Sequence, residues 1–380
     1  MQVRFIHTSD WQLGMTRWFL RDEAQARFSD DRIRCIEAIG ALATERVADF
    51  IVCAGDVFDD NNLSFRTLGR AREVLTRLPV PIYLLPGNHD PFDAAYKLDA
   101  VEAPGVHVLT DTAVHRVDGR DDVEIVGAPW TSKNPFDDLA GRALADLEPV
   151  ASGRARILVA HGQVAARTSE PTGDVIDLAG LEHALADRVI DYVALGDTHS
   201  TTDLSPTGRV WFSGAPLATD FREVATGGGE ADSGNVLVVT ITVDGTQSSV
   251  EVERVPVGMW RFEALTCELT NTAEVDRFLQ QLAEYPDKAR TVVKYWLTGA
   301  VSMVDYARLQ AGLEKYESIF AALFPRQRSE TVTVYPTDEE IDNLRLTPFA
   351  RSAVDTLRAG AGSRVDTDAL HLLYRLVERS

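Results

Sequence analysis

Short apolar runs alternate with helical segments over residues 1–258, and each run is bounded by Gly, Pro, Asp or His. Apolar runs of about 4–8 residues with these boundaries are typical of buried strands. We expect the strands at residues 3–8, 50–54, 82–86, 123–128, 157–160 and 192–196. Apolar residues at helical spacing predict intervening helices at 32–45, 65–78 and 137–147. Because strands and helices alternate, the sequence predicts a layered α/β fold.

Later segments of the same region also resemble strands. They lie at residues 210–213, 236–243 and 249–256, with a turn signal at Asp244-Gly245 between the last two. We expect these strands to complete the sheet in the antiparallel orientation. Residues 226–234 are rich in glycine, which predicts a flexible surface loop.

The pattern changes after residue 258. Strand, helix, strand, helix and strand are expected in turn at 260–269, 272–283, 289–298, 303–323 and 330–335. This order suggests a small split βαβ domain. Two helical pieces follow, at 348–359 and 365–379. We therefore expect a catalytic domain over 1–258, a small α+β domain over 259–345 and a helical tail over 346–380.

Charge and composition exclude several classes of protein. With 38 Lys and Arg against 58 Asp and Glu, the formal net charge is −20. This acidity argues against a protein that coats nucleic acid with a broad basic surface, but not against an enzyme that grips it at a metal-loaded cleft. No run approaches the ~18 consecutive apolar residues of a membrane span, and no signal-peptide pattern precedes the first strand. The 3 cysteines are too few for a disulfide framework, so we expect a cytoplasmic protein.

Polar motifs stand at the ends of the expected strands. They are Ser9-Asp10-Trp11-Gln12, Gly55-Asp56-Val57-Phe58-Asp59, Gly87-Asn88-His89-Asp90, His161-Gly162 and Gly196-Asp197-Thr198-His199. Loops that follow the carboxyl ends of strands in an open α/β sheet converge on one rim, where ligand sites form. These donors are oxygen and imidazole groups without a thiolate, which suits Mn²⁺, Mg²⁺ or Fe²⁺. Glycines before Asp56, Asn88 and Asp197 permit tight turns that aim the next side chain at a shared point. Each motif alone could be a cap or a turn, but together they predict a metal site.

The order of these motifs resembles that of the calcineurin-like metallophosphoesterases. The stretches 5–14 and 54–59 narrow the resemblance to the SbcD-type DNA repair exonucleases, which work with an SbcC-type ATPase. The resemblance covers residues 1 to about 220, and the later domain matches the capping domain of that family only in position and size. It implies a four-layer α/β/β/α sandwich with a small α+β C-terminal capping domain.

The resemblance also implies roles for individual residues. Two divalent metal ions, expected to be Mn²⁺ with Mg²⁺ or Fe²⁺ as alternatives, would be bridged by Asp56. His89 would act beside the scissile phosphate, and Asp59 stands where some relatives have a partner that orients this histidine. The remaining ligands would be Asp10, Gln12 and His199 for the first metal, and Asn88, His161 and Asp197 for the second.

Two positions depart from the family pattern. Gln12 and Asp197 stand where the family usually has histidine. An amide oxygen is a weaker ligand than imidazole, whereas Asp197 adds a carboxylate to the second site. The number of ligands is preserved, so the departures bear on metal identity and rate more than on the fold.

The function that this resemblance implies is a metal-dependent DNA exo/endonuclease in DNA repair, acting on phosphodiester bonds with an SbcC-like ATPase and as a homodimer. One alternative is a metallophosphoesterase on a smaller phosphoester, and another is a non-catalytic scaffold subunit. Two arginine clusters could contact DNA phosphates or could be solvated surface charge. They are Arg66, Arg70, Arg72 and Arg77, and Arg326, Arg328, Arg345 and Arg351.

Overall fold

The computed structural model describes residues 1–93, 98–132, 137–164, 175–326, 331–335, 346–359 and 369. The chain divides into two compact units, Met1–Phe262 and Glu263–Ser380, and each is described by itself. The division expected from the sequence, with boundaries after 258 and 345, stays a prediction. No helix among the described residues has both the length and the apolar character needed to cross a membrane.

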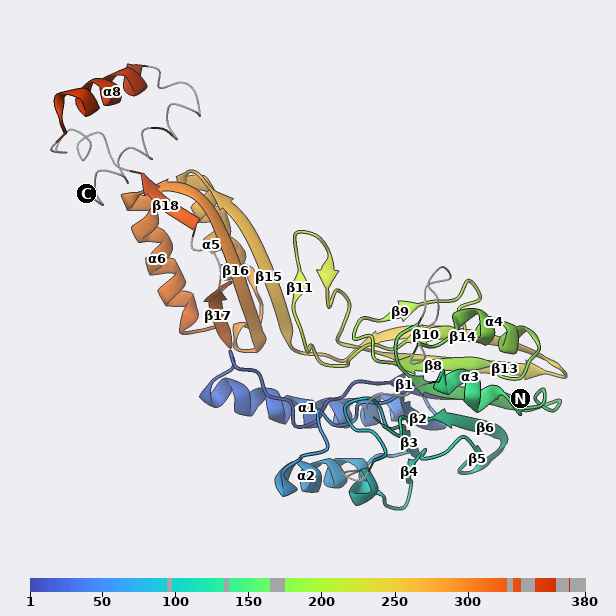
Figure 1. Cartoon of the computed structure of the whole chain (residues 1–380). Coiled ribbons are helices and arrows are strands. Elements are labelled where there is room, and N and C mark those ends of the chain that lie inside the picture. Colours follow the sequence, from blue (N-terminus) through green and yellow to red (C-terminus); the bar gives the residue numbers. More distant parts are fainter. Residues whose placement is uncertain are drawn as a thin grey trace. The chain divides into compact units, whose positions relative to one another are not determined.

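Two six-stranded sheets form the centre of the first unit (Figure 1). The first sheet has the order β14-β13-β1-β2-β3-β4. Its strands are β1 (Gln2–Thr8), β2 (Phe50–Cys53), β3 (Ile82–Leu84), β4 (Val106–Val108), β13 (Asn235–Asp244) and β14 (Gln247–Pro256). The second sheet has the order β5-β6-β7-β8-β10-β9. Its strands are β5 (Val114–Val117), β6 (Arg120–Ala128), β7 (Ala155–His161), β8 (Tyr192–Gly196), β9 (Thr202–Asp203) and β10 (Val210–Phe212).

Side chains alternate between the two faces of each strand, so both faces of each sheet are apolar and can be covered. The result is four layers: helices, first sheet, second sheet and helices. One apolar cluster lies between the two sheets, where Phe5 of β1 stacks on Phe50 of β2 and meets Tyr192 of β8 edge to face. A second cluster packs α1 (Asp22–Glu45) and α2 (Phe65–Leu75) on the first sheet, and a third packs α3 (Leu139–Leu144) and α4 (Leu178–Ala186) on the second. The expected α/β/β/α sandwich is therefore confirmed.

Strand direction follows the prediction in one place and departs from it in another. The long β13–β14 hairpin pairs antiparallel with β1, as expected. The strand at 210–213 was expected to be antiparallel, but β10 runs parallel to β8, with Val210 opposite Val193. The expectation was wrong because an apolar run predicts burial but not direction. The connection after β8 is long enough to return the chain to the other end of the sheet before β10 begins.

The segment 226–234, expected to be a flexible surface loop, includes one strand of a short hairpin. Strands β11 (Arg222–Glu223) and β12 (Gly228–Gly229) form a short hairpin there. The added Cβ of any other residue at Gly229 would lie 2.2 Å from the carbonyl oxygen of Phe221. Close backbone approach and a positive φ of 71° thus account for this glycine, and the next residue, Glu230, is buried.

The second unit is built on β15 (Arg261–Leu269), whose first residues belong to the first unit, with β16 (Thr291–Ser302), β17 (Ala322–Pro325) and β18 (Thr331–Tyr335). Both β17 and β18 pair parallel with β16. Helices α5 (Thr272–Glu284) and α6 (Met303–Glu317) pack on this sheet through Phe278 and Leu309. The helix expected over 303–323 was too long, because α6 ends at Glu317 and the residues after it form β17. Helix α8 (Pro348–Ala359) occupies the expected range, whereas the helix expected at 365–379 lies outside the described residues.

Candidate metal centre

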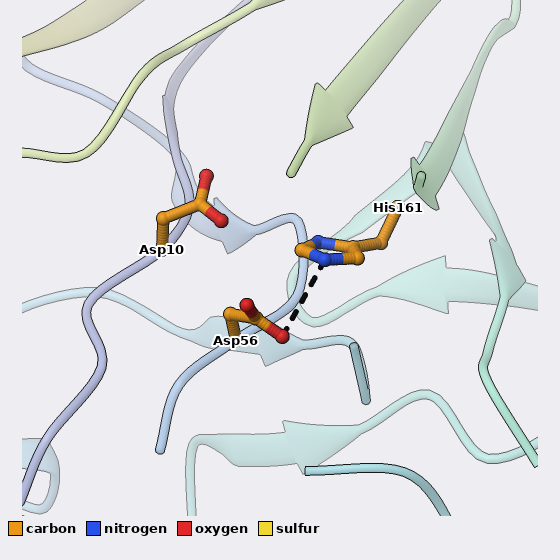
Figure 2. Close-up of side chains that lie close together, drawn as sticks. All are labelled: Asp10, Asp56 and His161. Atoms are coloured by element: carbon orange, nitrogen blue, oxygen red, sulfur yellow. Dashed lines mark ion pairs between the residues drawn. The ribbon is translucent and has the colours of Figure 1, made fainter. Parts of the chain in front are cut away.

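Three motif residues meet at the rim where the strands of both sheets end. Asp10 follows β1, Asp56 follows β2, and His161 ends β7 of the other sheet. All three are buried, and one ligand atom from each lies within 4.8 Å of the others (Figure 2). The motif loops predicted from the sequence to converge do so, and they come from both sheets of the sandwich.

His161 is held in the orientation that a metal ligand requires. Its Nδ1 atom lies 2.9 Å from the carbonyl oxygen of Ala54 and donates to it, which leaves Nε2 as the free ring nitrogen. Nε2 lies 3.4 Å from Asp56 Oδ1, 3.8 Å from Asp197 Oδ1 and 3.1 Å from Asn88 Oδ1. A metal-binding histidine commonly donates its second ring nitrogen to a carbonyl in this way.

His199 gathers the other predicted ligands. Its Nε2 atom lies 3.8 Å from Asp10 Oδ1 and 3.2 Å from Gln12 Nε2. The main-chain N–H of Asp197 donates to both carboxylate oxygens of Asp10, at 3.2 Å and 3.3 Å. The seven residues predicted as metal ligands therefore lie in one connected cluster, although their roles as ligands stay a prediction.

The backbone at this cluster is strained. Asp10, Gln12 and Asp56 have φ of 54°, 45° and 54°, and Asp197 has φ of 104°. Residues other than glycine rarely adopt positive φ, at a cost of about 1–3 kcal/mol each. Such strain concentrates at functional sites, because it persists only where surrounding contacts impose it.

The glycines of the motifs are required by close packing. An added Cβ at Gly55 would lie 2.2 Å from His161 Nδ1, and one at Gly87 would lie 2.3 Å from Asp56 Oδ1. At Gly196 it would lie 2.0 Å from the carbonyl oxygen of Ala54. Gly55 also has positive φ, as the expected tight turn requires. Gly87 and Gly196 do not have positive φ, and at these two positions the close approach of neighbouring atoms explains the glycine.

The chemistry of the cluster fits divalent cations. Gln12 Oε1 is buried without a hydrogen-bond partner in the part of the chain that the structure describes. A buried acceptor without a partner costs free energy, and a cation would satisfy it. Burial opposes the charge on His161, but Asp56, Asp10 and Asp197 raise its pKa to about 9. For Asp10, by contrast, burial itself raises the pKa, and the nearby His161 and His199 oppose this rise. The shift of His161 indicates a surplus of negative charge that hard cations would neutralise.

His89 stands at the open side of the cluster. Its Nδ1 atom lies 2.8 Å from the main-chain carbonyl oxygen of Asp59, and its Nε2 atom lies 3.9 Å from Asp56 Oδ2. The side chain is 45% exposed. Asp59 thus contacts the histidine as expected, but through its main chain.

Asp90 belongs to a quoted motif, yet the sequence analysis assigned it no role. It is fully buried and accepts hydrogen bonds from the main-chain N–H groups of Phe58, at 3.0 Å, and Gly87, at 2.8 Å. Burial and the nearby Asp56 carboxylate raise its pKa to about 8. Asp90 therefore joins the loop after β2 to the loop after β3.

Glu230 is a second residue that the sequence analysis missed. Its Oε2 atom lies 3.4 Å from His199 Nδ1, and both of its oxygens accept hydrogen bonds from Thr219. Burial raises the pKa of Glu230, but hydrogen bonds from His199, Ser233 and Thr219 outweigh burial and lower it. The motifs could not reveal this residue, because it lies in a glycine-rich stretch outside all five of them.

The arginines predicted to contact DNA are partly engaged elsewhere. Arg70 pairs with Asp30 at 2.5 Å, and Arg77 pairs with Glu73 at 2.5 Å. Both ion pairs favour the interpretation as surface charge for these two residues. Arg328 and Arg345 lie outside the described residues.

Comparison with known proteins identifies similar sequences and one similar structure. The family model for calcineurin-like phosphoesterases matches residues 3–201. The SbcD subunit of the SbcCD nuclease of Rhodobacter capsulatus is 28% identical over 274 residues, which cover 58% of this chain and 64% of that protein. The DNA double-strand break repair protein Mre11 of Methanosarcina mazei is 26% identical over 272 residues, covering 66% of this chain and 42% of that protein. A dimetal phosphatase structure from Danio rerio matches at 11% identity with a TM-score of 0.40, covering 67% of this chain and 99% of that one.

The chain thus spans less than two thirds of the length of the two curated relatives. The family match covers more than half of this chain and includes every motif loop of the buried cluster. The chain belongs to the calcineurin-like phosphoesterase family.

Proposed function

We propose that this chain is a metal-dependent DNA nuclease that hydrolyses phosphodiester bonds in DNA repair. The observation that carries the proposal is the buried group of Asp10, Asp56 and His161, with ligand atoms within 4.8 Å of one another. In this proposal the carboxylate of Asp56 is shared between two sets of donors. The match to curated proteins named as a nuclease and as a double-strand break repair protein supports DNA as the substrate.

The donor sets suggest how two metals would be held. Asp10, Gln12 and His199 would bind the first ion, and Asn88, His161 and Asp197 would bind the second, with Asp56 shared. When bound, two divalent ions supply a nucleophile at neutral pH by lowering the pKa of water, and they neutralise charge on the phosphate. Mn²⁺ is the proposed metal, with Mg²⁺ and Fe²⁺ as alternatives of similar ligand preference.

His89 is the proposed proton donor. Its Nδ1–H donates to the Asp59 carbonyl at 2.8 Å, which turns Nε2 toward the cluster. From this position Nε2 could give a proton to the oxygen that leaves phosphorus. The half-exposed ring also leaves this side of the site open to a long substrate.

The wider setting is proposed from the same relatives. We propose that the chain acts in the cytoplasm with a partner ATPase of the SbcC type, and as a homodimer. The chain's acidity supports the need for a partner, because a net charge of −20 repels a phosphate backbone. The alternatives remain a phosphoesterase on a smaller substrate and a non-catalytic scaffold.

Replacing His89 tests the proposal. We expect His89→Asn to slow Mn²⁺-dependent cleavage of end-labelled DNA by about 10²–10⁴-fold, the usual contribution of a general acid. Metal affinity measured by calorimetry should stay unchanged, because His89 is not among the proposed ligands. The matched control is His183→Asn, which removes an exposed histidine paired with Asp187 outside the cluster.

Assaying a chromogenic phosphodiester beside the DNA separates the alternatives. Diester hydrolysis without DNA cleavage, with and without the ATPase, would overturn the nuclease in favour of a smaller substrate. Metal binding with no activity on either substrate would indicate the scaffold. Equal rates for wild type and His89→Asn would remove His89 from the reaction.

A further inference from the structure

We propose that Glu230 is a positioning residue that fixes the tautomer of His199 through the hydroxyl of Thr219. The inference rests on the proposed function, in which His199 binds the first metal. It adds a residue that lies outside every strand-end motif, and it assigns that residue a defined chemical task.

A chain of short hydrogen bonds connects the three side chains. Thr219 Oγ1 lies 2.5 Å from His199 Nδ1 and 2.5 Å from Glu230 Oε2. The carboxylate also accepts from two main-chain N–H groups, those of Thr219 at 2.9 Å and Asp220 at 2.8 Å. Glu230 is only 8% exposed. A buried carboxylate surrounded by such donors acts purely as an acceptor.

The direction of these bonds follows from counting hydrogens. The Thr219 hydroxyl has a single hydrogen, and the carboxylate of Glu230 accepts it. Thr219 Oγ1 can then only accept from His199, so the proton of the imidazole must lie on Nδ1. Nε2 is left with a free lone pair, and Nε2 is the atom that faces Asp10 and Gln12. A metal binds only such an unprotonated ring nitrogen.

Two arginines hold the main chain at Ala218 and Thr219. Arg17 donates to the carbonyl oxygen of Thr219 through Nε at 2.9 Å and Nη2 at 2.5 Å. Buried Arg32 donates to the carbonyl of Ala218 at 3.4 Å and to that of Trp11 at 2.6 Å. Since Trp11 lies between Asp10 and Gln12, one side chain joins the segment behind His199 to the loop of its co-ligands. These bonds hold in place the main chain at Thr219, the middle member of the relay His199–Thr219–Glu230.

Gln12, which departs from the family pattern, indicates what the hydrogen bonds from Glu230 through Thr219 to His199 contribute to the first metal site. Gln12 stands where the family usually supplies a second imidazole, and an amide oxygen is the weaker ligand. A hydrogen-bonded carboxylate behind a histidine raises the basicity of the opposite ring nitrogen. Glu230 would thereby strengthen His199 at the site that Gln12 weakens.

The first readout is the tautomer of His199 in the metal-free protein, observed by ¹⁵N NMR of the imidazoles at alkaline pH. We expect Nδ1–H in the wild type and in Thr219→Ser, which keeps the hydroxyl. In Glu230→Gln the amide can donate to Thr219 Oγ1 and turn the hydroxyl toward His199, so Nε2–H should appear. Thr219→Val, which removes the relay, should show the same change.

The second readout is Mn²⁺ binding by calorimetry. Loss of a carboxylate behind a metal-binding histidine costs about 10–100-fold in affinity, and we expect this loss at one site while the other is unchanged. Glu124→Gln is the matched control, because Glu124 is also 8% exposed but pairs with Arg156 away from the cluster. It should change neither the tautomer nor the affinity.

Several results would overturn the inference. An Nδ1–H tautomer in Glu230→Gln would do so, as would equal weakening of both sites in a folded variant. If Glu230→Gln does not fold, the comparison of Thr219→Val with Thr219→Ser decides, and the same behaviour in both variants rejects the relay. Because the tautomer is read without metal or substrate, it is decided even if the protein cleaves no DNA.

Discussion

At the scale of single residues, the candidate site combines strain with burial. Asp10, Gln12 and Asp56 hold positive φ while their side chains are almost completely buried. Both conditions oppose folding, so they persist only because neighbouring contacts impose them. Part of that imposition is the tight packing of Gly55 against His161, of Gly87 against Asp56, and of Gly196 against the Ala54 carbonyl oxygen and His161. Substituting any of these glycines would displace a donor atom rather than merely alter a turn.

His7 gives a prediction about acid stability. It is fully buried in β1, with Nδ1 3.0 Å from the Tyr192 hydroxyl and Nε2 3.1 Å from the Leu195 carbonyl oxygen. Burial lowers its pKa to about 3, against a smaller opposing effect of the carbonyl. The unfolded chain therefore binds a proton below about pH 6.5 that the folded protein excludes. Stability should fall as pH decreases from about 6.5 toward 3, by at most about 1.4 kcal/mol per pH unit from this residue.

Urea denaturation of wild type and His7→Asn between pH 7 and pH 5 measures this effect. The variant removes the titrating group, so its free energy of unfolding should depend less steeply on pH. Its overall loss of stability from altered hydrogen bonds should be the same at each pH. Parallel curves for the two proteins would show that His7 contributes nothing to the pH dependence.

At the scale of elements, the site depends on how loops are joined. The motifs could be found in the sequence because each stands at or near the end of an apolar strand, and parallel strands end at a common rim. The roles of individual residues as ligands came from the family resemblance. Asp90 and Glu230 could not be assigned roles, because their partners are main-chain groups and hydroxyls that only the folded chain brings near. The same limit explains why the predicted direction of β10 was wrong and why the helix predicted at 303–323 was too long. Apolar patterns report burial, whereas pairing partners decide direction and length.

Asp90 provides a prediction at this scale. Asp90→Ala leaves the buried N–H groups of Phe58 and Gly87 without an acceptor, at a cost of about 1–3 kcal/mol for each. We expect a lower midpoint of urea denaturation, and weaker Mn²⁺ binding because the loop that carries Asn88 loses its anchor. Asp203→Ala is the control, since Asp203 accepts one N–H from Ser205 in an exposed position. A midpoint as little affected as in this control would show that Asp90 is not needed to join the loops.

At the scale of the whole molecule, stability should depend on metal. Folding brings several buried carboxylates together in a chain of net charge −20. Only the folded state assembles the donors, so bound ions stabilise it by mass action, by about 2.7 kcal/mol for a site at 100 times its Kd. Thermal unfolding with increasing Mn²⁺ should show a rising midpoint that a chelator reverses. Asp56→Asn should abolish the rise and Asp203→Asn should not. A midpoint in wild type that does not respond to Mn²⁺ would contradict metal binding at the cluster.

The origin of the donors in both sheets has a consequence for how the protein matures. Asp10, Asp56 and Asn88 follow strands of the first sheet, whereas His161, Asp197 and His199 follow strands of the second. Gln12 and His199, which touch, are 187 positions apart in sequence. Neither half of the sandwich can hold a complete ion site alone. During synthesis the proposed ion sites can therefore form only once both halves have closed, and metal uptake would report that closure.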